Sequence, residues 1–395
     1  MAVAAHIKET MANASFIRKM FELGAQLKKQ HGENNVCDFT LGNPDLEPPA
    51  LFQKTLVDIV NQKIPLKHGY MANAGFVETR QSVAAFVSSE QGVAFGENNI
   101  IMTCGAGGGL NVALKAILNP GDTVLVNVPY FVEYNFYIRN HGGEMVLVKT
   151  NDDFDLDIPA LEKAIDRRTA AVLINSPNNP TGTVYPENTI RELGRMLERK
   201  SAETGRAVYL ISDEPYRKIV YDGLTVPPLF SNYKNSIVVN SYSKDLSIPG
   251  ERLGYIAVHP QADDVRNLLD GMILCNRILG YVNAPALMQR VAARTQGLSV
   301  DVDLYKRRRD LLCGNLRNMG YDFVTPGGTF YLFPKAPGGN DVEFVNVLRE
   351  KLVLVVPGTG FGAPGYFRIV FCVPEEIILR SLPGFEYAIN RYRQK

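Results

Sequence analysis

Seven short apolar runs lie between residues 99 and 260, separated by longer segments that mix polar and apolar positions. Most of the runs are almost continuously apolar and rich in Val and Ile, which is typical of strands buried on both faces of a sheet. The runs are NIIMT (99–103), TVLVNVP (123–129), EMVLVKT (144–150), AAVLINS (170–176), AVYLISD (207–213), SIVVNSYS (236–243) and GYIAVHP (254–260). Several intervening segments, such as Glu187–Arg206, are long enough for helical crossovers. The pattern therefore predicts an α/β fold whose large domain contains a mostly parallel, seven-stranded sheet covered by helices.

The C-terminal third of the chain has a different pattern. Strand-like runs at 329–334, 352–357 and 366–373 alternate with helix-like stretches near 302–319 and 341–351, which predicts a smaller α+β domain. A chain of 395 residues also exceeds the size at which one hydrophobic core usually stops growing. We expect the large domain at residues 49–290 and the small C-terminal domain at 291–395, with residues 1–48 forming an N-terminal arm and part of the small domain.

The charge of the chain is nearly balanced, with 42 Lys and Arg against 41 Asp and Glu. This balance gives no electrostatic reason to expect nucleic acid or an anionic membrane as a partner. No apolar run is long enough to span a bilayer, and residues 1–20 resemble a short amphipathic arm and helix rather than a secretory signal. The five cysteines form no CxxC pair and the five histidines show no ligand spacing, so neither disulfides nor a metal site is expected. We expect a cytoplasmic protein.

Glycines and polar residues follow several predicted strands, at the sheet edge where α/β proteins bind ligands. After NIIMT the chain continues with Gly105-Ala106-Gly107-Gly108-Gly109 and then a helical pattern. Such a turn offers free backbone N–H groups and the positive end of a helix dipole to a phosphate. A tight strand–helix turn without a ligand is the alternative interpretation.

Two charged residues at strand ends are candidates for a catalytic site. Asp213 ends a buried apolar run, where a carboxylate is costly unless it meets a partner such as a protonated ring nitrogen, although a helix N-cap is the alternative. Lys244 follows another run, and a lysine near a cation such as Arg252 can have a depressed pKa and attack an aldehyde. Ser241, Ser243 and Arg252 would suit a phosphate.

Three motifs occur in an order that is known from one family. They are Asn178-Asn179-Pro180-Thr181-Gly182, Asp213-Glu214-Pro215-Tyr216, and Ser241-Tyr242-Ser243-Lys244 followed by Arg252-Leu253-Gly254. With these motifs the chain resembles the class I/II aminotransferases, in the fold-type I group of pyridoxal-phosphate-dependent enzymes, over nearly its whole length. The resemblance implies pyridoxal 5′-phosphate as the cofactor and the large domain as the part that binds it.

The resemblance also implies the catalytic residues, which are Lys244, Asp213 and Tyr216. Lys244 is expected to form the Schiff base (internal aldimine) with the cofactor and to shuttle a proton once the substrate releases it. Asp213 is expected to pair with the protonated pyridine nitrogen and so keep the ring an electron sink. Asn179 and Tyr216 are expected to hydrogen-bond the 3-oxygen of the ring.

The other cofactor contacts are implied in the same way. The phosphate is expected to bind at the glycine-rich turn and after the strand at 236–243, through Gly105, Ala106, Gly107, Ser241, Ser243 and Arg252. Phe131 resembles the aromatic residue that stacks on the ring, with Tyr130 as the alternative. Tyr70 matches a tyrosine that reaches the phosphate in the neighbouring subunit, which requires a homodimer with shared active sites.

Substrate contacts are implied as well. Arg368 matches an arginine that binds the substrate α-carboxylate by a bidentate fork, Gly42 matches a loop that closes over the substrate, and Asn179 is expected beside them. Arg277 lies near a position from which some relatives supply a cation for dicarboxylic substrates, with a surface arginine as the alternative.

Many relatives carry a hydroxyl or a longer side chain where this chain has Gly107–Gly109. Phosphate binding there would therefore depend on backbone amides.

The implied function is a ping-pong transfer of an amino group between an L-amino acid and a 2-oxo acid. The nearest alternative is a pyridoxal-phosphate-dependent β-lyase acting on a cysteine conjugate, which would use the same residues. A serine hydrolase is a remote alternative, because Ser241 and Lys244 also satisfy Ser-x-x-Lys, but no Lys-Thr-Gly strand accompanies them. The donor is left open; an aromatic-friendly pocket would require Tyr70, Phe131, Tyr281 and Phe330 all to face it.

Overall fold

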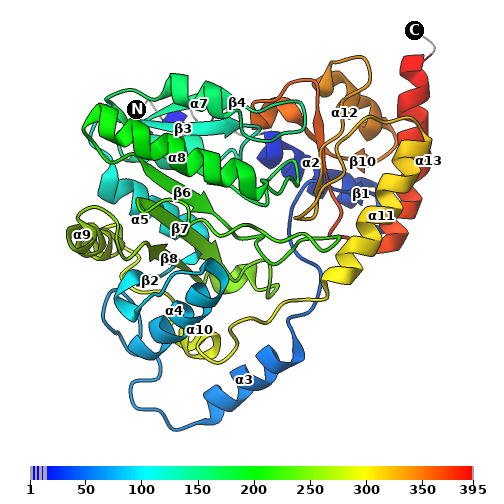
Figure 1. Ribbon diagram of the computed structural model, residues 1–395. Helices are drawn as coiled ribbons and strands as arrows, with labels where there is room; N and C mark the ends of the chain where they lie inside the picture. Colours follow the sequence, from blue (N-terminus) through cyan, green and yellow to red (C-terminus); the bar gives the residue numbers. More distant parts are fainter. Residues whose placement is uncertain (1–2, 5–6, 9–10, 12–15, 394–395) are drawn as a thin grey trace.

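A seven-stranded sheet forms the centre of the protein (Figure 1). The computed structural model describes residues 3–4, 7–8, 11 and 16–393. The strands are β2 (Ile100–Thr103), β3 (Thr123–Val128), β4 (Glu144–Lys149), β5 (Thr169–Asn175), β6 (Tyr209–Asp213), β7 (Ser236–Ser241) and β8 (Gly254–Val258), in the order β2-β8-β7-β6-β5-β3-β4. β8 runs antiparallel to both of its neighbours, and the other pairs are parallel. All seven apolar runs contain a strand, which confirms the predicted mostly parallel sheet.

Helices cover both faces of this sheet. The helices of this part of the chain are α3 (Ala50–Asn61), α4 (Val77–Gln91), α5 (Gly105–Ile117), α6 (Tyr134–Asn140), α7 (Ile158–Ala164), α8 (Glu187–Thr204), α9 (Val265–Ile278) and α10 (Ala286–Ala292), with short 3₁₀ turns η2 (Glu97–Asn99) and η3 (Pro249–Glu251); of these, α3 packs on α10 rather than on the sheet. Neighbouring residues of β5 enter two different hydrophobic clusters: Val172 shares one with Leu193 of α8, and Leu173 shares the other with Leu110 of α5. This two-sided burial explains why most of the strands are continuously apolar in sequence, while the edge strand β4 is largely exposed.

The two ends of the chain form a smaller group of elements beside the sheet (Figure 1). They are α2 (Phe16–His31), η1 (Glu33–Asn35), β1 (Cys37–Asp38), α11 (Val302–Asn318), β9 (Tyr331–Leu332), α12 (Asp341–Glu350), β10 (Val353–Leu354), β11 (Val356–Pro357), η4 (Gly358–Phe361), β12 (Phe367–Val370) and α13 (Glu375–Arg393). β1 pairs in parallel with β10, and Phe39 shares a hydrophobic cluster with Phe344 and Phe385. The predicted domain bounds at 48 and 290 stay a prediction, and most of the expected arm lies outside the described residues.

The strands of this smaller group are shorter than the sequence predicts. The run at 352–357 divides into β10 and β11, because β10 pairs with β1 while β11 pairs antiparallel with β12. The run at 366–373 contributes only the four residues of β12, which also pairs with β9. The expected helices near 302–319 and 341–351 correspond to α11 and α12. Among the described residues, none of the helices combines the length and apolar character that crossing a bilayer needs.

Candidate active site

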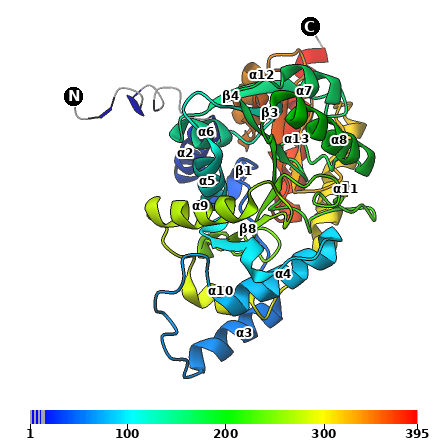
Figure 2. The ribbon, with the colours of Figure 1, turned by 60° about the vertical axis from the view of Figure 1, so that its left-hand side comes forward.

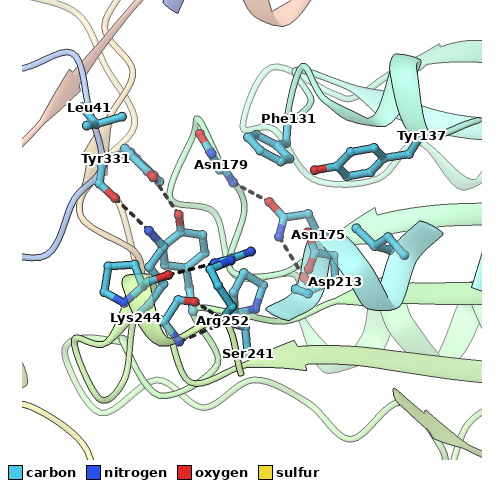
Figure 3. Close-up of a pocket in the computed structure, with 18 of the residues that line it drawn as sticks. Leu41, Phe131, Tyr137, Asn175, Asn179, Asp213, Ser241, Lys244, Arg252 and Tyr331 are labelled. Carbon is cyan, nitrogen blue, oxygen red and sulfur yellow. Dashed lines mark hydrogen bonds between the residues drawn. The ribbon is translucent and has the colours of Figure 1, made fainter. Parts of the chain in front are cut away.

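A cavity of about 300 Å³ lies at the carboxyl ends of the parallel strands, facing the smaller group of elements (Figure 3). Asn175 and Asp213 are the last residues of β5 and β6, and Lys244 follows β7, so three neighbouring strands bring side chains to one place. Tyr331 of β9 and Arg368 of β12 line the cavity from the smaller group of elements. This is the sheet edge where α/β proteins bind ligands.

Most of the predicted site residues line this cavity. They are Gly42, Ala106, Gly107, Phe131, Asn179, Asp213, Tyr216, Ser241, Ser243, Lys244, Arg252 and Arg368. Gly105 lies directly behind Arg252 instead, since a Cβ atom at Gly105 would be 2.8 Å from Arg252 Nη2. Tyr70 is 87 % exposed and lies at a separate hollow beside Asn283, so its expected contact with a second subunit stays a prediction.

The Lys244 side chain reaches across the cavity, where its Nζ donates a 2.8 Å hydrogen bond to the backbone oxygen of Gly42. Burial is the main reason why the pKa of Lys244 falls to about 8, and it outweighs the opposing effect of Cys372. The positive charges of Arg368 and Arg252 lower this pKa further. The amine is therefore neutral far more often near physiological pH than that of an ordinary lysine, and the neutral form is the one that attacks an aldehyde.

This environment predicts an unusual titration. In the cofactor-free protein, the Lys244 amine is expected to titrate near pH 8, well below the value of about 10.4 for an ordinary lysine. An NMR titration of isotope-labelled lysine measures this directly. Replacing Arg252 with Gln is expected to raise the Lys244 pKa, because loss of a nearby positive charge favours the protonated amine. Titration of Lys244 together with the exposed lysines would contradict the prediction.

Asp213 is the acid that lines the cavity, and only 5 % of its surface is exposed. Its Oδ2 accepts a 2.7 Å hydrogen bond from the hydroxyl of Tyr134, while its Oδ1 is buried without a hydrogen-bond partner. Burial raises the pKa of Asp213 to about 7, although the Tyr134 hydrogen bond acts in the opposite direction. An acid with one fixed and one free oxygen is suited to receive a hydrogen bond from a positively charged donor.

The start of α5 forms another wall of the cavity. No side chain caps this helix at Cys104, so the N–H groups of its first turn, including those of Ala106 and Gly107, remain available to an anion. The helix can begin here because Gly105 adopts a φ of +70°, which a residue with a side chain rarely adopts. The predicted glycine-rich turn into a helix is therefore present.

Two hydroxyls and one guanidinium lie beside this helix start. Ser241 Oγ donates a 2.6 Å hydrogen bond to Ser243 Oγ, and Arg252 Nη1 donates to the backbone oxygen of Pro249 at 2.9 Å. Arg252 has a left-handed φ of 53°, which is uncommon for a residue with a side chain. Together these donors suit a phosphate.

Arg368 is only 3 % exposed and is held on several sides. Its Nη1 donates to Asn179 Oδ1 at 3.0 Å, and its Nη2 donates to the backbone oxygen of Thr40 at 2.7 Å. The guanidinium lies 4.7 Å from the ring centroids of both Tyr331 and Phe361, and its Nε is buried without a hydrogen-bond partner. A rigidly held guanidinium with an unused donor suits a carboxylate.

Tyr331 is a residue of the site that the sequence did not predict, and its hydroxyl lies 2.6 Å from that of Tyr216. An aromatic-friendly pocket would require Phe330 to face it, but Phe330 is fully buried in the smaller core, whereas Tyr331 lines the cavity. No local pattern separates the two residues, because both rings contact the ring of Tyr216 and their centroids lie 5.1 Å from each other. Tyr331 also explains why residue 42 is a glycine, because a Cβ atom at position 42 would collide with the Tyr331 hydroxyl.

The structure also separates the aromatic alternatives. Phe131 lines the cavity, whereas Tyr130 packs against Gly362. Tyr281 does not line the cavity of its own chain, so the aromatic-friendly pocket expected from Tyr70, Phe131, Tyr281 and Phe330 does not form within the described part of one chain.

The serine hydrolase alternative is not favoured. That chemistry requires the lysine amine to take the proton of the Ser241 hydroxyl. Here the Lys244 amine is hydrogen-bonded to the backbone oxygen of Gly42, and the Ser241 hydroxyl is hydrogen-bonded to Ser243. Asp213 and Arg368, which line the same cavity, would also have no role in it.

Comparison with known proteins places the chain in a family. The sequence pattern of aminotransferase class I and II matches residues 34–380. A probable aspartate/prephenate aminotransferase of Thermus aquaticus is 34% identical over 366 residues, which cover 90% of this chain and 92% of that protein. A crystal structure of an amino transferase from Eubacterium rectale has 40% identity and a TM-score of 0.96, with 99% of each chain covered. Aspartate aminotransferase from Thermus thermophilus, solved with maleate, has 28% identity and a TM-score of 0.83, with 95% of this chain and 96% of that chain covered.

The fold and these similarities define a pyridoxal-phosphate-dependent enzyme of fold type I. The chain belongs to the class I and II aminotransferase family. The predictions of fold, cofactor and aminotransferase activity are confirmed, and the β-lyase alternative is not favoured, because the matched relatives are named aminotransferases.

The residues of the cavity fit this cofactor. The free Oδ1 of Asp213 is a buried acceptor that lacks a partner, as a protonated pyridine nitrogen requires. The uncapped start of α5 with Ser241, Ser243 and Arg252 suits the phosphate, and the Lys244 amine suits the aldehyde.

Proposed function

We propose that the protein moves amino groups between L-amino acids and 2-oxo acids in a ping-pong cycle, with Lys244 as the covalent anchor of the cofactor and the proton carrier. One observation carries this proposal: a single cavity unites the Lys244 amine, the unpartnered Oδ1 of Asp213 and the buried guanidinium of Arg368. These three groups match the needs of an aldehyde, a protonated ring nitrogen and an α-carboxylate.

Bound pyridoxal phosphate supplies an aldehyde that reacts with amines and a ring that withdraws electrons from the substrate Cα. Asp213 would hold the positive charge at the ring nitrogen through Oδ1, while Tyr134 fixes the carboxylate through Oδ2. Lys244 would take the proton from the substrate Cα, and its lowered pKa supplies the neutral amine that this step needs.

The remaining residues would orient the reactants. The N–H groups of Ala106 and Gly107 would bind the phosphate with Ser241, Ser243 and Arg252, and Gly105 keeps Arg252 close to them. Asn179 and Tyr216 would bind the ring's 3-oxygen, with Tyr331 fixing the Tyr216 hydroxyl. Phe131 would cover the ring face. Arg368 would bind the α-carboxylate beneath the Gly42 loop, which the Lys244 amine already contacts.

A homodimer is part of the proposal. Tyr70, which is 87 % exposed, would complete the phosphate site of a second copy, and Arg277, also exposed, would approach its substrate. α3 extends away from the body of the protein (Figure 2) and exposes Leu51, Val57 and Val60, as an interface helix would before its partner covers it. The five cysteines are unpaired, which supports a cytoplasmic location.

A spectroscopic half-reaction tests the function. Purified protein loaded with pyridoxal phosphate should lose its visible absorption when an amino-acid donor is added, and recover it when a 2-oxo acid follows. Aspartate as donor and prephenate as acceptor come first, because a relative is named for them. Release of pyruvate and ammonia from a cysteine conjugate without an acceptor would instead support the lyase. A colourless protein that stays colourless with added cofactor would refute the proposal.

Replacing Arg368 with lysine is expected to raise the KM for amino acids by about 10- to 100-fold, because a lysine cannot form the two-pronged contact with a carboxylate. Steady-state kinetics measures this effect. An amine that lacks a carboxylate is the matched control, and it should react equally slowly with both proteins. Equal loss of activity towards the amine and the amino acid would contradict the carboxylate role.

A further inference from the structure

Tyr137 occupies the space beside the first turn of α5 that Gly107 leaves open. A Cβ atom at Gly107 would lie 3.0 Å from Tyr137 Oη and 3.7 Å from Tyr137 Cζ. Tyr137 belongs to α6, and its ring points from that helix into the cavity (Figure 3). The hydroxyl therefore lies close to the position where a side chain of residue 107 would begin.

The Tyr137 hydroxyl has no hydrogen-bond partner within the described part of the chain, although it lies between charged groups. Burial raises its pKa well above the ordinary value, and the acids Glu133 and Asp213 add to this effect while Arg252 opposes it. The group thus stays protonated and is able to donate. Gly107 and Arg252 line the same cavity as Tyr137, so this hydroxyl joins the N–H groups at the start of α5 and the Arg252 guanidinium as a third donor there, an arrangement that suits an anionic acceptor.

We propose that Tyr137 donates a hydrogen bond to the cofactor phosphate, and that residue 107 is a glycine because a side chain there would displace this hydroxyl. The inference rests on the proposed function, which puts the phosphate at the start of α5. The other proposed phosphate contacts come from the glycine-rich turn and from the segment after β7, whereas Tyr137 would add a contact from α6. A charge-assisted hydrogen bond of this kind strengthens binding by about 10-fold or more.

Two cofactor forms separate the phosphate contact from a ring contact. The Tyr137→Phe protein is expected to bind pyridoxal phosphate about 10-fold more weakly than the wild type, while its affinity for pyridoxal, which lacks the phosphate, stays the same. Equilibrium titration of the cofactor-free proteins gives both dissociation constants, and phosphorus NMR should show a shifted resonance for the bound phosphate. Tyr209→Phe is the matched control, because it removes a hydroxyl at the far end of β6, 3.5 Å from the backbone oxygen of Asp263.

A second variant tests the link with position 107. Gly107→Ala alone is expected to weaken pyridoxal phosphate binding, because the new Cβ crowds Tyr137 Oη. In the Tyr137→Phe background the same change should have little further effect, since the atom it crowds is absent; such non-additivity indicates direct coupling.

Two results would overturn the inference. One is an unchanged affinity of Tyr137→Phe for pyridoxal phosphate, and the other is an equal loss of affinity for pyridoxal phosphate and pyridoxal. Failure of the proposed function looks different, because the wild-type protein itself would then fail to prefer pyridoxal phosphate over pyridoxal.

Discussion

Replacing Lys244 with alanine is expected to lower the transamination rate by about 10⁴-fold, the upper range for loss of a positioned acid–base group. The variant loses both the amine that anchors the aldehyde and the base that takes the proton from the substrate. No other lysine lines the cavity among the described residues, so no neighbouring amine can substitute. Single-turnover measurements of the amino-acid half-reaction give the rate, and the visible spectrum reports whether the cofactor is still bound.

Lys234→Ala is the matched control for this variant. Lys234 is a partly exposed lysine that pairs with Asp263, and because neither residue lines the cavity, its removal should leave the rate unchanged. A small primary amine added to Lys244→Ala should restore part of the proton transfer, which a merely misfolded protein would not show. Lys244→Ala activity above one hundredth of the wild-type rate would contradict the assigned role.

The large sheet was predictable because most of its strands are buried on both faces, which makes them continuous apolar runs; the exposed edge strand β4 is the exception. The smaller group of elements was less predictable for the opposite reason. Its strands are two to four residues long, and β1 pairs with β10, a partner more than 300 residues away in sequence. A strand of two residues has no periodicity of its own, so its existence depends on a contact that local sequence does not contain.

In the candidate site, too, residues within sequence motifs were predictable, whereas contacts between segments far apart in sequence were not. Asp213 and Lys244 were predictable because each follows a recognisable strand within a family motif. Tyr134, Tyr137 and Tyr331 lie in segments where an aromatic residue is usually part of a core. Only the folded chain shows that their hydroxyls meet Asp213, the start of α5 and Tyr216, respectively. Side-chain contacts between distant segments were therefore the part that sequence reasoning missed.

Replacing Asp213 with asparagine is expected to lower kcat by about 10²- to 10³-fold while the protein remains folded, a loss typical of removing one preorganised electrostatic group. The two side chains have nearly the same shape, so the Tyr134 hydroxyl can still donate to the oxygen of the amide. That arrangement turns the amide nitrogen, a donor, towards the site of the unpartnered Oδ1. A donor there cannot stabilise a protonated ring nitrogen, so the variant should bind the cofactor but activate the substrate Cα poorly.

Tyr134→Phe separates this electrostatic role from a structural one, because it keeps the Asp213 carboxylate and removes only the hydrogen bond at Oδ2. That hydrogen bond lowers the pKa of Asp213, so its loss must raise the pKa above the present value of about 7. The carboxylate is needed in its ionised form, and the acid limb of the pH–rate profile is therefore expected to move to higher pH in Tyr134→Phe. Activity at high pH should approach that of the wild type, whereas Asp213→Asn should stay slow at every pH. An Asp213→Asn enzyme that recovered fully at high pH would show that the charge of Asp213 is dispensable.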